Sequence, residues 1–486
     1  NKERYGYALV DGIRMEIGNY TVEPSSIFMG RGMHPLRGKW KEGPCHEDIE
    51  LNLSPDAPRP PGNWKAIVWE PDAMWIARWR DKLSGKMKYV WLSDASILKQ
   101  RRDIEKFDKA QELRRNLERI QRHIWENLDA EDLKRRKTAT VCYLIDKLKF
   151  RVGDEKDDDE ADTVGASTLR PEHLRFNGDG TVTFDFLGKD SVHHHIKAKL
   201  PERVIRNLKE FSANAESTLF DGVDSKRVSE FLDEVMTGLS AKVFRTCYAS
   251  EAVETKLERT KVAPDDPDYV KKYAATMANL EAAKVCNHKR TIPKTWETSL
   301  QRKKERLKAR IAKAKENEAK LRQRAEDAKR KFRERLRKYE ETLQEHRDRL
   351  KEYRRQLEER KKQGKTARSL EKRVASKRKA IRTMKQRIEK LKASHAERMK
   401  RLREQLERRR QRDREAIEKL RLQIRAQEAT RDYNLGTSLK SYIDPRIYYS
   451  WGLRVNYDWK NYYPKTLQRK FSWVEAHHDA PRPGNP

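Results

Sequence analysis

Several features that define common protein classes are missing from this 486-residue sequence. It has no apolar run of about eighteen residues and no amino-terminal signal pattern, which argues against insertion into a membrane or export across one. It has no GxxxxGK[ST] phosphate loop, so ATP-driven work has no visible basis. Its four cysteines are widely separated and form no CxxC pair, which argues against a zinc ribbon or a disulfide framework and favours a reducing environment.

Two stretches with metal-binding residue types have the wrong pattern for a metal site. The acids of "GDEKDDDEAD" (153–162) are consecutive, and the stretch lacks the glycine and terminal glutamate of an EF-hand loop, so a solvated acidic loop is the better interpretation. The histidines of "HHH" (193–195) fall on a predicted strand, where neighbouring side chains face opposite ways. Neither stretch predicts a bound metal.

Basic residues are in large excess and are unevenly distributed. The net charge of +34 favours a polyanionic partner such as nucleic acid, because Lys and Arg displace the counterions condensed on its backbone; an acidic membrane surface is the rival interpretation. Residues 301–430 hold 50 lysines and arginines against 22 aspartates and glutamates, a net charge of +28. Most of the basicity therefore belongs to one segment of the chain.

This basic segment has the pattern of an antiparallel helical hairpin. It contains no proline, and apolar or small residues recur at alternating steps of three and four, as in a coiled coil. Its one glycine, Gly364, divides it into two similar arms, each of which would reach about 95 Å. The repeat breaks phase at 332–336 and at 395–399, both about thirty residues from Gly364, so these breaks are expected to face each other.

The rest of the chain is predicted to be α+β. Residues 62–92 alternate apolar and polar side chains around a "KLSGK" turn, which indicates antiparallel strands. The period becomes helical from about residue 103 to 150. A second strand hairpin is predicted at 181–198, with Gly188, Lys189 and Asp190 at its tip, and helices are predicted through much of 201–285.

A scattered set of cations and one tyrosine suggest phosphoryl-transfer chemistry. The cationic residues are Arg151, Lys189, Arg245 and His288, and the tyrosine is Tyr442, which lies in "NLGTSLKSYIDPR" just after the basic segment. Taken singly, each cation is more often structural. Together they match what transfer of a phosphoryl group to a protein hydroxyl requires: groups that bind the phosphate oxygens, a proton donor for the leaving oxygen and an attacking phenol.

The sequence also resembles a known family along nearly its whole length outside the basic segment. The motifs that support the resemblance are "FMGRGMHP", "YLIDKLKFRVGDEK", "ADTVGASTLRPEHL", "FDFLGKDS", "AKVFRT", "CNHKRTIPKT", "NLGTSLKSYIDPR" and "PKTLQRKFSW". They occur in the order found in eukaryotic-type DNA topoisomerase IB. The resemblance implies relaxation of supercoiled double-stranded DNA through a 3′-phosphotyrosyl intermediate and strand rotation. It also implies that neither ATP nor an obligatory metal is needed, and that the protein acts as a monomer on chromosomal DNA inside the cell.

The resemblance assigns a role to each member of the cationic set. Tyr442 matches the nucleophile, while Arg151, Arg245 and His288 match the groups that hold the nonbridging phosphate oxygens. Lys189 matches the general acid that protonates the 5′ oxygen.

Three further positions match residues near the DNA, and a fourth matches a drug-binding position. Arg31, His34 and Asp190, together with Lys189, match DNA-facing positions. Ser441 occupies the position where many eukaryotic members have an asparagine that helps bind camptothecin, so the resemblance implies weaker sensitivity to that drug.

The resemblance also suggests how the chain is divided. We expect part of a β-rich DNA-binding clamp at 1–102, a mainly helical catalytic core at 103–299, a coiled-coil linker at 300–430 and a short helical segment with the nucleophile at 431–486. Compared with the family, we expect the first part of the clamp lobe to be absent. The amino-acid sequence around Tyr442 is more similar to that of archaeal members than to that of animal or plant members.

Two other functions fit some of these features. A tyrosine recombinase uses a similar cationic cluster, but the second arginine here lies in Lys-Val-Phe-Arg rather than HxxR. A non-catalytic DNA-binding coiled-coil protein would explain the basic segment but not the five separate motif residues. If the first interpretation holds, the basic segment is expected to lie along DNA and slow its rotation, an effect that salt weakens.

Overall fold

The computed structural model describes residues 1–30, 34–153 and 163–477 of the chain. These residues form two compact units, one made of 1–293 with 429–486 and the other of 294–428, and each unit is described by itself. Short sheets accompany many helices, which confirms the α+β class. In the described part of the chain, no helix is long and apolar enough to span a membrane.

The first ninety residues form small sheets. In the largest sheet the strand order is β6-β5-β7-β8, and Trp75, Ala77 and Trp79 of β7 point into its core because alternate residues of a strand face the same side. The expected antiparallel pair around "KLSGK" is β7 and β8, but β6 pairs in parallel with β5 instead of antiparallel within the 62–92 stretch. The strands are β1 (Tyr7–Val10), β2 (Ile13–Glu16), β3 (Ser26–Ile27), β4 (Trp40–Lys41), β5 (Ile49–Asn52), β6 (Ala66–Val68), β7 (Trp75–Arg80) and β8 (Met87–Trp91). A short helix, α1 (Lys2–Tyr5), precedes them.

The predicted helical stretch from residue 103 to 150 is confirmed and consists of three helices. The first begins earlier, at Ile97, because the Ser96 hydroxyl accepts a hydrogen bond from the Lys99 amide and caps it. Asn116 separates the first two helices, and the Asp132 carboxylate caps the third. The helices are α2 (Ile97–Arg115), α3 (Leu117–Asn127) and α4 (Leu133–Leu148).

The second strand hairpin is confirmed where the sequence predicts it. Strands β10 and β11 pair from Thr181↔Lys199 to Gly188↔Val192, and Lys189–Ser191 forms a single 3-10 turn at the tip. Together with β9 they make a three-stranded sheet, and helices follow, as expected. The bounds are β9 (Leu174–Phe176), β10 (Thr181–Gly188), β11 (Val192–Lys199), α5 (Glu202–Ala213), α6 (Ser225–Asp233), α7 (Ala241–Arg259) and α8 (Asp268–Val285).

The carboxy-terminal segment joins the core formed by α2, α7 and α8. Tyr448, which is only 1% exposed, donates a hydrogen bond of 2.9 Å from its hydroxyl to the Ala275 carbonyl oxygen, and Trp451 and Phe471 are buried in the same cluster. This packing holds the segment against α7, which bears Arg245, and α8, which ends three residues before His288. Its helices are α11 (Leu435–Ser441), α12 (Pro445–Val455) and α13 (Lys465–Lys470).

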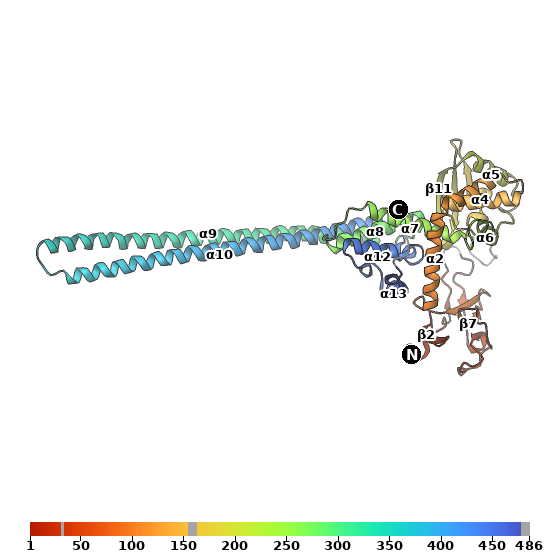
Figure 1. Ribbon diagram of the computed structural model, residues 1–486, viewed down its shortest axis with the longest axis horizontal. Helices are drawn as coiled ribbons and strands as arrows, with labels where there is room; N and C mark the ends of the chain where they lie inside the picture. The colour runs from red at the N-terminus through yellow and green to blue at the C-terminus, as the bar shows by residue number, and fades with distance from the viewer. Residues whose placement is uncertain (31–33, 154–162, 478–486) are drawn as a thin grey trace. The chain divides into compact units, whose positions relative to one another are not determined.

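The second unit is the predicted hairpin of two long helices, α9 (Trp296–Lys362) and α10 (Arg368–Ala429), which lie side by side (Figure 1). Gly364 in the turn has a φ of 64°, a left-handed conformation that favours glycine. The two phase breaks of the repeat face each other as predicted, because Phe332 and His395 stack with ring centroids 4.0 Å apart and planes 7° apart.

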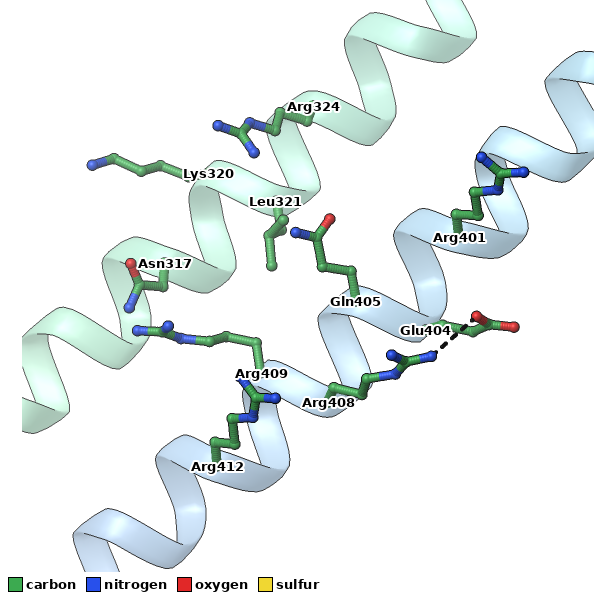
Figure 2. Close-up of a pocket in the computed structure, with 10 residues that line it drawn as sticks. All are labelled: Asn317, Lys320, Leu321, Arg324, Arg401, Glu404, Gln405, Arg408, Arg409 and Arg412. Atoms are coloured by element: carbon green, nitrogen blue, oxygen red, sulfur yellow. Dashed lines mark ion pairs between the residues drawn. The ribbon is translucent and has the colours of Figure 1, made fainter.

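Polar residues interrupt the apolar seam of this hairpin nearer its base. The Asp413 carboxylate is buried and accepts hydrogen bonds from Arg310 at 2.9 Å and Arg409 at 3.0 Å. Beside it lies a groove of about 600 Å³, with side chains from both helices around it (Figure 2). Among the residues that line the groove in the described structure, six are Lys or Arg and one, Glu404, is acidic.

Candidate active site

A short antiparallel pairing brings the His288 loop next to the segment that leads to Tyr442. Lys289 forms an isolated β-bridge with Tyr433, and the Asn434 amide donates a hydrogen bond of 2.7 Å to the His288 carbonyl oxygen. The Asn434 side chain in turn caps α11 by accepting from the Gly436 amide at 3.0 Å. Residues about 150 positions apart in the sequence therefore meet at the start of the helix that ends just before Tyr442.

Arg245 is the most buried of the predicted cations, with 3% of its surface exposed. It lies on α7, and its two terminal nitrogens donate to the carbonyl oxygens of Lys149 at 2.8 Å and Cys286 at 2.6 Å. The Nη2 atom is also 3.1 Å from Nε2 of His288. Since a guanidinium only donates, this imidazole nitrogen is the acceptor. Arg245 thus ties together the end of α4, the end of α8 and His288.

Tyr442 lies directly against Arg245 and His288. Its ring centroid is 5.1 Å from that of His288, and the Arg245 guanidinium carbon lies 5.2 Å from the tyrosine ring centroid. The Ser250 hydroxyl holds the backbone that follows Tyr442, because it donates to the Tyr442 carbonyl at 3.2 Å and accepts from the Asp444 amide at 3.0 Å. Arg245 and Ser250 both belong to α7, so one helix positions the cation and the tyrosine.

A short turn that starts at Tyr442 joins two helices. Helix α11 ends at Ser441, and α12 begins at Pro445, with the Asp444 carboxylate accepting a hydrogen bond of 3.0 Å from the Arg446 amide as its cap. Tyr442 is the first of the three residues between the two helices and is only partly buried. Its neighbour Tyr448 is a core residue, which distinguishes the two aromatics.

Arg151 and Lys189 line the same cleft as Arg245 and His288. Arg151 lies two residues after Lys149, whose left-handed backbone (φ 58°, ψ 29°) ends helix α4. Lys189 is exposed at the β10–β11 tip. The cleft has a volume of about 710 Å³, and none of its lining residues in the described structure is acidic. These residues are Arg151, Lys189, Ser191, Val192, His193, His194, Arg245, Cys286, Asn287, His288, Lys289, Arg290, Thr291, Asn434 and Thr437.

Burial and positive charge keep both inner histidines of the cleft neutral. Burial, followed by the charges of Arg245 and Arg151, lowers the pKa of His288 to about 3. Burial, followed by the charges of Arg245, Lys289 and Arg151, lowers the pKa of His194 to about 4. A phosphate in the cleft would oppose these charges and favour a protonated His288. A cleft whose charges oppose further protonation is thus suited to an anion.

The remaining predicted positions lie elsewhere or are only partly described. His34 accepts a hydrogen bond of 3.1 Å from the Leu36 amide and contacts Phe28; it does not line the cleft. Arg31 lies outside the described residues, as does almost all of the acidic stretch 153–162. Asp190 belongs to the 3-10 turn at the hairpin tip, and Ser441 is the partly buried last residue of α11.

Sequence reasoning missed two residues of the cleft. His194 was considered only as part of "HHH", and the strand alternation indeed separates it from its neighbours: His193 and His195 are exposed and both contact Asp185, whereas His194 is partly buried and lines the cleft. His193 also borders the cleft, but from its exposed side. Asn287 precedes His288 and has a φ of 49°. The alternation of side chains along the strand could have indicated that His194 faces away from His193 and His195. No feature of the sequence pointed to Asn287.

No metal centre was found in the ranges 1–30, 34–153 and 163–477, where no three His, Cys, Asp or Glu residues are arranged to hold an ion.

The chain is similar to known proteins along most of its length. Residues 1–92 match the family model described as eukaryotic DNA topoisomerase I, DNA binding fragment. Residues 95–325 match eukaryotic DNA topoisomerase I, catalytic core, and residues 414–480 match the C-terminal topoisomerase domain. All the cleft residues lie within the second and third of these matches.

Individual relatives give the same result. The chain is 34% identical to DNA topoisomerase 1 alpha of Arabidopsis thaliana over 485 residues, which cover 97% of this chain and 46% of that protein. It is 31% identical to DNA topoisomerase 1 of Homo sapiens over 487 residues, 97% of this chain and 55% of that protein. It is 35% identical to DNA topoisomerase 1 of Drosophila melanogaster over 320 residues, 63% of this chain and 33% of that protein. The chain thus spans about half the length of the first two relatives.

Proposed function

The chain belongs to the eukaryotic-type DNA topoisomerase IB family, and on this premise we propose that it relaxes supercoiled double-stranded DNA by transient cleavage of one strand. One observation supports this proposal above the others: the Tyr442 ring lies about 5 Å from both the Arg245 guanidinium and the His288 ring. The cleft beside it is lined by several cations, and none of its lining residues in the described structure is acidic. A phenol held among such groups suits attack on a phosphodiester.

We propose the following cleavage step. The Tyr442 oxygen attacks the phosphorus, a bond forms between them, and the bond from phosphorus to the 5′ oxygen breaks. The phenol proton leaves to water, and the Lys189 ammonium gives a proton to the departing 5′ oxygen. The DNA is left with a 3′-phosphotyrosyl link and a free 5′ hydroxyl.

Three cationic or hydrogen-bonding groups stabilise the charge that develops on the nonbridging oxygens. We assign this role to Arg151, Arg245 and His288, because preformed donors in a partly dry site stabilise a transition state without reorganising. The same positive charge also stabilises the negative charge that develops on the Tyr442 oxygen as it attacks.

Religation is the reverse reaction, in which the 5′ hydroxyl attacks the phosphotyrosine. Because the phosphotyrosine conserves the free energy of the broken bond, the cycle needs no ATP. The arginines and the lysine supply the charge stabilisation, so the proposal also requires no obligatory metal. Between the two steps the free 5′ strand rotates and releases supercoils of either sign.

The experiment that tests this function is relaxation of a supercoiled plasmid in EDTA without ATP. Relaxation with a covalent protein–DNA intermediate supports the proposal. Strand exchange between paired sites would instead indicate a recombinase, and DNA binding without nicking would indicate a non-catalytic binding protein.

We propose that the DNA contacts are mostly to phosphates. Arg31, His34, Lys189 and Asp190 are assigned to the DNA-facing surface by their match to the family motifs. A lysine at a narrow hairpin tip suits the minor groove, where A·T and T·A pairs present acceptors at similar places, so sequence preference is expected to be weak. We further propose that the protein acts as a monomer on chromosomal DNA inside the cell. We also propose that the chain is divided into a clamp (1–102), a catalytic core (103–299), a linker (300–430) and a segment with the nucleophile (431–486).

Ser441 makes a drug-sensitivity prediction possible. The Ser441→Asn variant is expected to accumulate more camptothecin-stabilised cleavage complexes than the unchanged protein, since the longer amide side chain next to Tyr442 places its donor and its acceptor farther from the backbone than the serine hydroxyl reaches. The complexes are counted after denaturation with detergent, with and without drug. Equal drug-induced trapping in both proteins would contradict the prediction. Cleavage without drug serves as the control.

The basic hairpin is proposed to slow DNA rotation through its charge. Among the residues around the groove of Figure 2, Arg324 and Arg412 have no ion-pair partner in the described part of the chain, and the one ion pair drawn there joins Arg408 to Glu404 at 3.5 Å. Unneutralised arginines from two helices are suited to the closely spaced phosphates of DNA.

Replacement of residues 305–425 by a short loop is therefore expected to lower DNA affinity at low salt about tenfold and to reduce its dependence on salt. Rotation should become faster, which single-molecule relaxation would record as more supercoils removed per cleavage event. A full-length variant with Lys320, Arg324, Arg401, Arg408 and Arg412 changed to glutamine is expected to show part of both effects. Arg409 is left unchanged there because it pairs with buried Asp413. Unchanged rotation and religation in both variants would contradict the proposal.

A further inference from the structure

A hydrogen bond joins the Lys189 hairpin to the His288 loop. The Asn287 amide nitrogen Nδ2 lies 2.9 Å from Nδ1 of His194. His194 belongs to β11, which pairs with the strand that ends next to Lys189, and Asn287 immediately precedes His288. The bond therefore connects two walls of the cleft, one with the proposed general acid and the other with a proposed phosphate ligand.

The imidazole of His194 is held in one orientation by the strand hairpin itself. It stacks on Phe186 with ring centroids 4.8 Å apart and planes 4° apart. It also lies against Gly188, the last residue before Lys189, so closely that a Cβ atom at that position would come within 2.6 Å of Nε2. A shift of the ring therefore presses on the backbone at the hairpin tip, and a shift of the tip presses on the ring.

Asn287 is equally constrained on the opposite wall. Its φ of 49° is in the left-handed region, which asparagine tolerates better than most residues. The backbone N–H of Asn287 donates to the Lys284 carbonyl at 3.0 Å, and the backbone N–H of His288 donates to the Ala283 carbonyl at 2.8 Å. These two bonds fix the turn after α8. The Asn287 side chain thus projects from a rigid support toward His194.

We propose that His194 and Asn287 are positioning residues that hold the tip of the β10–β11 hairpin at the distance from His288 at which Lys189 protonates the 5′ oxygen. This inference rests on the proposed function and adds to it. Neither residue takes part in bond making. The neutral imidazole accepts the Asn287 hydrogen bond through Nδ1, and in this form it adds no charge that would repel Lys189.

The chemistry of the leaving group distinguishes this role from a purely structural one. In an ordinary substrate the bond from phosphorus to the 5′ oxygen breaks as Lys189 gives that oxygen a proton. In a substrate with sulfur at the 5′ bridging position, the bond from phosphorus to sulfur breaks and the sulfur leaves as a thiolate, which needs no proton because a thiol is far more acidic than an alcohol. A residue that acts only through Lys189 is therefore dispensable with the sulfur substrate.

The experiment measures single-turnover formation of the covalent adduct by the full chain on both substrates. His194→Ala is expected to slow cleavage of the ordinary substrate about tenfold, part of the loss expected for a missing general acid, and to cleave the sulfur substrate within about twofold of the unchanged protein. Asn287→Gly keeps the left-handed backbone but removes the amide, and it is expected to behave in the same way. His194→Gln, whose amide can still accept a hydrogen bond, is expected to recover part of the rate on the ordinary substrate.

His195→Ala is the matched control. His195 lies next in the same strand, is exposed and does not line the cleft, so its loss should leave both rates unchanged. Equal slowing of both substrates by His194→Ala, or no slowing of either, in a variant that unfolds at the same temperature as the unchanged protein would overturn the inference. If His194→Ala proves unstable, Asn287→Gly decides by the same comparison. Failure of the unchanged protein to form an adduct with either substrate would instead refute the proposed function.

Discussion

The Tyr442→Phe variant is expected to bind DNA normally and to relax it at least about 10⁴-fold more slowly, with no covalent adduct formed. Phenylalanine preserves the ring that lies 5.1 Å from His288 and 5.2 Å from Arg245. The backbone bonds to Ser250 do not involve the phenol either. The variant therefore removes the attacking oxygen and leaves the packing of the site in place, so the loss is assigned to chemistry.

Two measurements check this expectation. Plasmid relaxation in EDTA gives the rate, and detergent denaturation of the reaction shows whether protein remains attached to the 3′ end of the cut strand. Tyr449→Phe, which removes a hydroxyl from a partly buried tyrosine seven residues later, is the control and is expected to keep normal relaxation. Relaxation by Tyr442→Phe at a normal rate would show that another residue is the nucleophile.

Features with a short sequence period could be predicted well. The heptad pattern and one glycine predicted two long helices, and two phase breaks predicted the contact that Phe332 and His395 make. The hairpin at 181–198 followed from strand alternation and a glycine near its tip. In each case the determining interactions are between residues that are close in the sequence or related by a regular repeat.

Features that depend on long-range packing could not be predicted in the same way. The motif match assigned roles to Arg151, Lys189, Arg245, His288 and Tyr442 without stating what holds them together. Pairing of the residues around His288 with those around Tyr433, and the two carbonyl oxygens that anchor Arg245, join segments far apart in the chain.

Local rules also failed where two preferences competed. The helical period between residues 103 and 150 is continuous, yet caps at Asn116 and Asp132 divide it into three helices. Strand β6 satisfies the alternation expected of an antiparallel strand but pairs in parallel with β5, because alternation specifies the buried face and not the direction of the partner. His194 was hidden within "HHH" for a related reason: its role depends on which face of β11 covers the cleft.

Arg245 is expected to combine the largest catalytic effect among the cations with a large effect on stability. Arg245→Ala should slow single-turnover cleavage about 10³-fold, the size of effect seen when a preformed transition-state donor is lost. It should also leave the carbonyl oxygens of Lys149 and Cys286 without their donor, at about 1–3 kcal/mol for each group in the free energy of unfolding. Burial of the residue, at 3% exposure, makes replacement of these bonds by water difficult.

Arg245→Lys separates charge from geometry. Lysine keeps the positive charge next to Tyr442, but its single ammonium cannot reproduce the fork that reaches Lys149, Cys286 and His288 together. Stability should recover in part, while cleavage should remain about 10²-fold slow because the donors to the phosphate are misplaced. Urea unfolding gives the stability, and adduct formation well below the midpoint of unfolding gives the rate.

Arg114→Ala is the matched control for this pair. Arg114 forms an ion pair at 2.5 Å with Glu254, which like Arg245 lies on α7, but it is partly exposed and outside the cleft. Its loss is expected to lower the free energy of unfolding by about 1 kcal/mol or less and to leave cleavage unchanged.

If Arg245→Lys cleaved DNA as fast as the unchanged protein, charge alone would suffice at position 245. The bonds of Arg245 to the two carbonyls would then serve only the fold, and the donors that matter would be Arg151 and His288.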